Sequence, residues 1–194
     1  MMAADKFAQN NVLVKKEISG YENFTRLLQL SLTFFVLFCA FFTCQNMASL
    51  VLEKDGMDNL GFYILAVLYF SIAVSSIMST ALLKKLGTYK CLIFGGFGHF
   101  CFVFAQIFPA VKYDHPENDS FITSNGFITG LLIICALING AGAALIWVSN
   151  GNYISECATP KTKGFFYGFF WIVYMMSQVV GSLIGAAILK SGKQ

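Results

Sequence analysis

Charge is scarce in this sequence and absent from its long apolar stretches. Of the 194 residues, 12% are charged and 57% are hydrophobic, whereas soluble domains carry about 25% charged residues. Proton and sodium relays in membranes usually depend on buried carboxylates. His99 is the one physiologically titratable residue within the apolar stretches. Ion-coupled transport therefore has little support.

The sequence also lacks the residue patterns of common catalytic and metal sites. Its six cysteines form no CxxC pair, and His99 and His115 have no metal-ligand spacing. Paired carboxylates and a base-oriented nucleophile are missing as well, and we interpret Ser155 and Glu156 as polar residues at a helix end. We expect reduced cysteines, no catalytic residue, no metal and no cofactor. The net charge of +3 is dispersed, which argues against a nucleic-acid partner.

Long apolar stretches are what the sequence does contain. Residues 27–52 extend far enough, at about 1.5 Å per helical residue, to cross a bilayer core of about 30 Å. Solid runs of this kind exclude a β-barrel, whose strands alternate in polarity. The sequence predicts an all-α membrane protein, with a tail over 1–26, a membrane domain over 27–190 and a short tail over 191–194. We expect five transmembrane helices, at about 27–52, 61–83, 91–111, 121–148 and 165–189.

The distribution of basic residues predicts the orientation in the membrane. Nine Lys and Arg residues fall in the N-terminal tail and in the second and fourth loops, and four fall on the other side. Because cytosolic segments retain basic residues, we expect a cytosolic N-terminus, in a membrane that the sequence does not identify. Asn118, in an Asn-Asp-Ser sequon on the opposite side, is a candidate for glycosylation.

Small residues within the apolar stretches predict where helices pack closely. In lipid, helices associate where small side chains let their backbones approach. The last stretch has two GxxxG pairs, Gly164 with Gly168 and Gly181 with Gly185, and the offset of thirteen residues turns them to different faces. We predict helix packing at both pairs and at Gly140, whose surroundings lack the third glycine of a dinucleotide-binding fingerprint.

Polar side chains also occur inside these stretches, where they are costly and usually face the bundle or a wet cavity. Five of them are candidates to line a substrate path: Asn46, Ser49, Asn139, Tyr174 and Gln178. The alternative interpretation is that they make interhelical hydrogen bonds, worth only about 0.6 to 2 kcal/mol each.

The junction between the last two stretches carries the most specific pattern in the chain. A tryptophan precedes a Gly-Asn-Tyr triplet, and after a short loop a lysine and a glycine open an aromatic-rich segment. The residues concerned are Trp147, Gly151, Asn152, Tyr153, Lys163 and Trp171. The pattern resembles the N-terminal half of the UNC-93-like family of the major facilitator superfamily, over about residues 27–187. We expect residues 147–153 to form the cytosolic end of the fourth helix and residues 156–163 to form a helix-connecting turn. The triplet either shapes that turn or contacts a partner.

The resemblance implies part of a fold that commonly has about a dozen helices. The best-known members of the family regulate potassium channels or escort membrane receptors. The function it favours is that of a noncatalytic multi-pass subunit or regulator in the lipid bilayer. Its partner would be a channel, a receptor, a larger assembly or a second copy of the chain.

The alternative is a small-solute transporter that works as an oligomer of truncated halves. Facilitators place an acidic gate residue between their second and third helices, but this chain has Lys84 there, and Thr80 replaces the first glycine of that motif. The chain also ends after five of the six helices that form half of a facilitator. Both features disfavour ordinary alternating access, and the second leaves open a partial product that lacks its second half.

Overall fold

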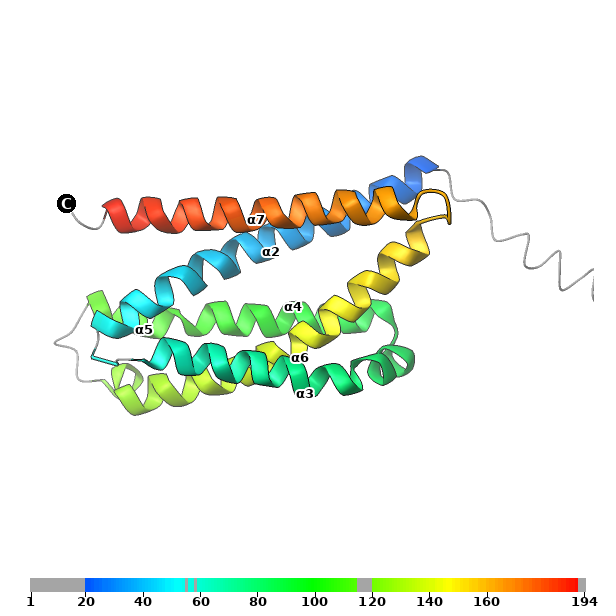
Figure 1. Ribbon diagram of the computed structural model, residues 1–194. Coiled ribbons are helices and arrows are strands. Elements are labelled where there is room, and N and C mark those ends of the chain that lie inside the picture. The colour runs from blue at the N-terminus through cyan, green and yellow to red at the C-terminus, as the bar shows by residue number, and fades with distance from the viewer. Residues whose placement is uncertain (1–19, 55, 58, 115–119, 192–194) are drawn as a thin grey trace, which may run out of the picture.

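The computed structural model describes residues 20–54, 56–57, 59–114 and 120–191, without the side chains of 20–22, 49–50 and 54. Its elements are α2 (Gly20–Lys54), α3 (Leu60–Leu86), α4 (Thr88–Ala105), α5 (Ile107–Asp114), the short 3-10 helix η1 (Phe121–Thr123), α6 (Asn125–Cys157) and α7 (Lys163–Ser191) (Figure 1). Within these residues no strand forms, and five helical segments are long and apolar enough to cross a membrane. The prediction of an all-α membrane protein with five transmembrane helices is confirmed.

Proline and glycine determine two of the helix boundaries. The third span is interrupted at Gln106, which separates α4 from α5. Pro109 accounts for this break, because it has no N–H to donate to the carbonyl of Ala105 and its ring would collide with that carbonyl in a regular helix. Gly87 alone links α3 to α4, at a φ of 84° that favours glycine. The last turn of α3 and the first turn of α4 are therefore held close together.

Several helices extend beyond the apolar stretches of the sequence. α6 continues to Cys157 through a polar segment, although the apolar stretch stops at residue 148. Hydropathy marks the part of a helix that lipid covers, whereas the helix itself stops where its backbone hydrogen bonds stop. The polar end of α6 is thus a helical continuation that projects toward the headgroup region.

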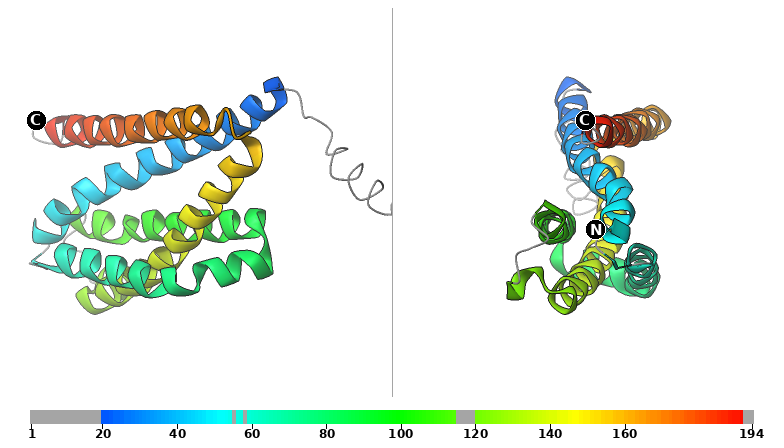
Figure 2. Two further views of the ribbon diagram at one scale, coloured as in Figure 1. Left: turned by 45° about the vertical axis from the view of Figure 1, so that its right-hand side comes forward. Right: turned by 90° about the vertical axis from the view of Figure 1, so that its left-hand side faces the viewer.

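The helices form two sets. α6 packs along both α3 and α4, and α2 packs along α7 (Figures 1 and 2). We call these the α3–α4–α6 group and the α2–α7 pair. Aromatic rings join them: Phe38 of α2 lies 5.0 Å from the ring of His99, and Phe41 lies 5.6 Å from Phe102, both on α4. The buried core contains residues of α2, α3, α4, α6 and α7, so it extends through both sets.

Glycines set the close contacts within the α3–α4–α6 group. A Cβ added to Gly95 would lie 2.5 Å from the Cβ of Ile146 and 2.7 Å from the carbonyl oxygen of Gly142. A Cβ added to Gly140 would lie 2.5 Å from the Cβ of Ser71. Separations this short leave no room for a side chain, so α6 approaches both neighbours backbone to backbone.

Candidate functional site

The polar end of α6 is joined by hydrogen bonds to the first turns of two other helices. Asn152 Nδ2 donates to Thr88 Oγ1 at 2.9 Å, on α4, and to Glu156 Oε1 at 2.6 Å. Tyr167 Oη, on α7, donates to the carbonyl oxygen of Gly151 at 2.6 Å and lies 2.8 Å from Ser155 Oγ. We call the set Thr88, Gly151, Asn152, Ser155, Glu156 and Tyr167 the helix-end junction. It fastens α4, α6 and α7 to one another at one end of the bundle.

The other residues of the family pattern lie in or beside this junction. The ring of Tyr153 meets that of Tyr89, the second residue of α4, edge to face at 5.9 Å. A Cβ added to Gly151 would fit, because its nearest neighbour would be Tyr167 Oη at 3.8 Å. At this position the carbonyl oxygen, which accepts the hydrogen bond from Tyr167, therefore matters more to the junction than the absence of a side chain. Lys163 is exposed at the start of α7. In the part of the chain that the structure describes, the triplet therefore shapes helix contacts.

Trp147 and Trp171 of the pattern stack on each other, with ring centroids 5.7 Å apart and planes 11° apart. Tyr174 meets Trp147 edge to face at 5.0 Å, and Phe38 of α2 meets Tyr174 at the same distance. Edge-to-face and offset-stacked pairs of this kind add about 0.5 to 1.5 kcal/mol each beyond the area they bury. The aromatic cluster thus holds α2, α6 and α7 at one level of the bundle.

Four of the five polar candidates have described side chains, and these four lie in different surroundings rather than in one cavity. Asn46 Nδ2 donates to Ser182 Oγ at 3.0 Å, and both residues are exposed, as is Gln178 one turn before Ser182. Tyr174 is half-buried in the aromatic cluster. Asn139 is 1% exposed in α6, and neither amide atom has a hydrogen-bond partner among the described residues. The side chain of Ser49 and all of Asn118 lie outside the described residues.

We call the exposed set Asn46, Gln178 and Ser182 the polar strip. Thr43 anchors it, because its hydroxyl donates to the carbonyl oxygen of Gly181 at 3.0 Å and so ties α2 to α7. On α7 the exposed side chains of Trp171 and Met175 lie at helical spacing on the same face as Gln178 and Ser182. The α2–α7 pair therefore presents hydrogen-bonding groups flanked by large apolar side chains.

The two GxxxG pairs have different surroundings. A Cβ on Gly181 would lie 2.8 Å from the carbonyl oxygen of Cys39, and one on Gly185 would lie 3.8 Å from that of Thr43. A Cβ on Gly164 or Gly168 would meet nothing within 4 Å among the described residues. The second pair thus lies at the α2–α7 contact, and the first lies on an open face of α7.

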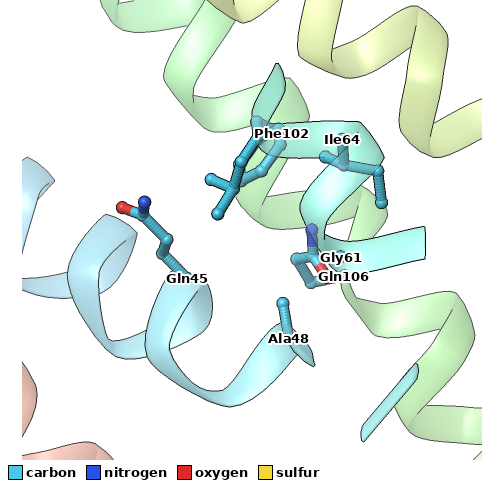
Figure 3. Close-up of a pocket in the computed structure, with 7 residues that line it drawn as sticks. Gln45, Ala48, Gly61, Ile64, Phe102 and Gln106 are labelled. Carbon is cyan, nitrogen blue, oxygen red and sulfur yellow. The ribbon is translucent and has the colours of Figure 1, made fainter. Parts of the chain in front are cut away.

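A small pocket lies between α2, α3 and α4 (Figure 3). Gln45, Ile64, Phe102 and Gln106 are among its lining residues, and it holds about one water molecule. The described residues contain no group of three or more His, Cys, Asp or Glu side chains able to hold a metal ion. A pocket of this size is too small for an organic solute, and Asn46, Asn139, Tyr174 and Gln178 are not among its lining residues.

Neither Thr88 nor Tyr167 was predicted to contact the end of α6. The one feature of the sequence that could have indicated these contacts is the order of the helices and turns. Both residues follow turns on the side where α6 ends, so α4 and α7 begin beside that end. Which side chains meet there depends on helix rotation, and spacing in the sequence does not specify it.

Comparison with known proteins identifies relatives of this chain. Residues 54–194 match the family described as "Ion channel regulatory protein UNC-93". UNC93-like protein 3 of Arabidopsis thaliana is 29% identical over 175 residues, which cover 85% of this chain and 33% of that protein. A Caenorhabditis elegans protein, unc-93, provisionally named as a potassium channel regulatory protein, is 27% identical over 191 residues, which cover 97% of this chain and 24% of that protein. No solved structure matches the chain.

A further relative, UNC93-like protein MFSD11 of Xenopus tropicalis, is 22% identical over 160 residues, which cover 81% of this chain and 32% of that protein. The chain thus spans about a third or less of the length of these relatives. The family match includes four of the five spanning segments and the whole helix-end junction. With its five apolar helices this is an integral membrane protein, and the chain belongs to the UNC-93 family.

Proposed function

We propose that this chain is part of a noncatalytic regulator of another membrane protein, and that an ion channel is the first partner to test. The family is described by ion channel regulation, and the C. elegans relative is provisionally named for potassium channels. Because the chain spans about a third or less of the length of its relatives, channel regulation by this chain is our proposal.

The single observation that carries the proposal is the uncovered polar strip. Asn46, Gln178 and Ser182 are exposed on helices that cross the membrane. Lipid tails offer no hydrogen-bond partner, and polar side chains at membrane depth almost always face protein or a water-filled cavity. We therefore infer that protein outside the described chain covers the strip, and we propose a channel, a receptor or a larger assembly as that protein.

The apolar neighbours of the strip suit a protein interface. Trp171 is 44% exposed and Met175 is 48% exposed, on the same face of α7 as Gln178. Tryptophan is enriched at interface hot spots, and methionine adapts its shape to varied partners. In the assembly we expect these two side chains to supply packing and the strip to supply hydrogen bonds that select the partner.

The transporter alternative is disfavoured by two observations. The apolar stretches contain no carboxylate, lysine or arginine that could couple a solute to an ion gradient. The pocket beside Gln106 holds about one water molecule. By itself this pocket gives a solute no path through the described helices.

We also propose that the helix-end junction lies on the cytosolic side, with the N-terminus. The lysines of the α3–α4 turn and of the α6–α7 turn lie at that end, and cytosolic loops retain basic residues. On this orientation Asn118 would face the lumen or the cell exterior. Labelling the Thr88→Cys and Phe121→Cys variants with a membrane-impermeant maleimide in sealed cells tests it. Labelling of the Thr88→Cys variant from outside would overturn the orientation.

Photo-crosslinking tests the function directly. A photoreactive amino acid replaces Gln178 in the full chain, which is expressed in its native membrane, and the crosslinked products are identified by mass spectrometry. The same amino acid at Ile77, which is 84% exposed on α3, is the matched control for a lipid-facing position. We expect a protein adduct at position 178 and lipid adducts at position 77.

The outcomes separate the candidate partners. A channel or receptor adduct at position 178 supports regulation, and an adduct of two identical chains supports a homo-oligomer. If position 178 yields only lipid adducts, as position 77 does, and the chain migrates alone in mild detergent, the proposal is wrong.

A further inference from the structure

The two ends of the helix bundle carry very different charge. At the end with the helix-end junction, the described Lys, Arg, Asp and Glu side chains are six cations and one acid, a net charge of +5: Arg26, Lys84, Lys85, Lys90, Lys161, Lys163 and Glu156. At the opposite end they are two cations and two acids, a net charge of zero: Lys112, Lys190, Glu53 and Asp114. Figure 1 places the α3–α4 turn, the α6–α7 turn and the start of α2 at the same end of the molecule. We call this surface the basic end.

The cations of the basic end are all exposed. Its one described acid, Glu156, already accepts a hydrogen bond from Asn152 at 2.6 Å. Folding therefore leaves these positive charges to be balanced by something outside the described part of the chain. The arrangement differs from an ordinary solvated surface, where both signs are interspersed.

The densest part of the basic end lies at the α3–α4 turn. Lys84 and Lys85 lie in the last turn of α3, and Lys90 lies in the first turn of α4. Because Gly87 alone joins the two helices, these three ammonium groups are confined to one short hairpin. The apolar stretches of α3 and α4 begin within one turn of it, so the lysines lie at the depth of the lipid headgroups.

We propose that the basic end binds the phosphate groups of anionic phospholipids in the adjacent leaflet, with Lys84, Lys85 and Lys90 as the principal contacts. Lysine clusters immediately beside membrane helices attract anionic lipid, and each lysine near the surface adds to the attraction. A nucleic acid or an acidic soluble protein fits less well, because the cations lie directly beside the ends of spanning helices, at headgroup depth. This proposal rests on charge placement and does not depend on the proposed regulatory function.

Lipid retention measured by native mass spectrometry tests the proposal. The full chain is purified in mild detergent and exposed to mixed micelles of phosphatidylcholine with either phosphatidylserine or phosphatidylinositol bisphosphate. We expect both anionic lipids to be retained over phosphatidylcholine, and the preference to fall as salt screens the charges. In the triple variant Lys84→Gln, Lys85→Gln, Lys90→Gln, retention of anionic lipid should fall by about tenfold or more.

Two matched variants make the test specific. Lys112→Gln with Lys190→Gln removes cations from the opposite end and should leave retention unchanged. Lys84→Arg, Lys85→Arg, Lys90→Arg keeps the charge and should keep the preference, and it shows that the hairpin tolerates substitution. Equal retention of phosphatidylcholine and anionic lipids by the unmodified chain would overturn the proposal. So would an equal loss in the glutamine variants of the two ends.

Discussion

The α3–α4–α6 group and the α2–α7 pair are built from similar helices but are packed to different degrees. In the first, α6 has a neighbour on two sides and meets both through glycine contacts. In the second, α7 packs along α2 and meets α6 through Tyr167, Trp171 and Tyr174, and much of its other surface is open, with hydrogen-bonding groups along it. The comparison separates what holds this chain together from what it offers to a partner. Substitutions at matched positions test that separation.

The largest effect should come from Gly140, at the centre of the α3–α4–α6 group. In Gly140→Ala the new Cβ would lie 2.5 Å from the Cβ of Ser71 and 2.6 Å from the carbonyl oxygen of Leu68, so the two backbones must separate. We expect the free energy of unfolding in micelles to fall by about 1 to 3 kcal/mol. Gly130→Ala, on the same helix with nothing within 4 Å, is the control and should be neutral or stabilising. Equal effects of the two substitutions would show that this contact is looser than described.

A smaller loss is expected at Gly181, in the α2–α7 pair. In Gly181→Ala the Cβ would lie 2.8 Å from the carbonyl oxygen of Cys39, which would move α7 away from α2. Because α7 has few other neighbours, it can shift at a cost of about 1 kcal/mol. Disulfide formation between cysteines introduced at Asn46 and Ser182, whose side chains lie 3.0 Å apart, should slow, while thermal unfolding changes little. Gly168→Ala is the control, and a slower crosslink there as well would argue against a local contact at Gly181.

The helix-end junction should contribute less again. Tyr167→Phe removes the hydrogen bonds to the carbonyl of Gly151 and to Ser155, and we expect a loss of about 0.5 to 1.5 kcal/mol. Hydrogen exchange should become faster in the first turns of α7 and remain unchanged in α3. Tyr69→Phe, on the 60% exposed Tyr69 of α3, is the matched control. An unchanged exchange pattern in Tyr167→Phe would mean that the aromatic cluster alone holds this end of α7.

The smallest effect on stability should come from the polar strip. Gln178→Leu changes an exposed side chain, so the free energy of unfolding should change by no more than about 0.5 kcal/mol. Co-purification of partners from native membranes should nevertheless fall, because the substitution removes a hydrogen-bonding group from the open face. Ile184→Leu, at a 43% exposed position, is the control. Undiminished co-purification in Gln178→Leu would remove the strip from the proposed interface.

The membrane fold could be predicted from the sequence because the cost of charge in lipid is local. A stretch without Asp, Glu, Lys or Arg that exceeds the bilayer thickness crosses it as a helix whatever its neighbours are. The break at Gln106 was also visible in principle, since it follows from Pro109 and the carbonyl four residues before it. The candidate site was harder to predict from the sequence. Asn46, Gln178 and Asn139 look alike in sequence, yet two lie on the open face and one is buried in α6.

The amino-acid sequence alone specifies the class of protein and the number of spanning helices, because each depends on composition within single segments. It also specifies the charge of the bundle ends, because successive spans alternate in direction and so assign each loop to one end. Only packing in three dimensions selects the glycine pair that meets a neighbour. Gly164 with Gly168 and Gly181 with Gly185 have the same spacing on the same helix, but only the second pair faces α2. The same holds for the contacts of Asn152 and Tyr167 and for the exposure of the polar strip. Whether a side chain is buried, paired or exposed depends on which helices surround it, and long-range packing determines the positions of those helices.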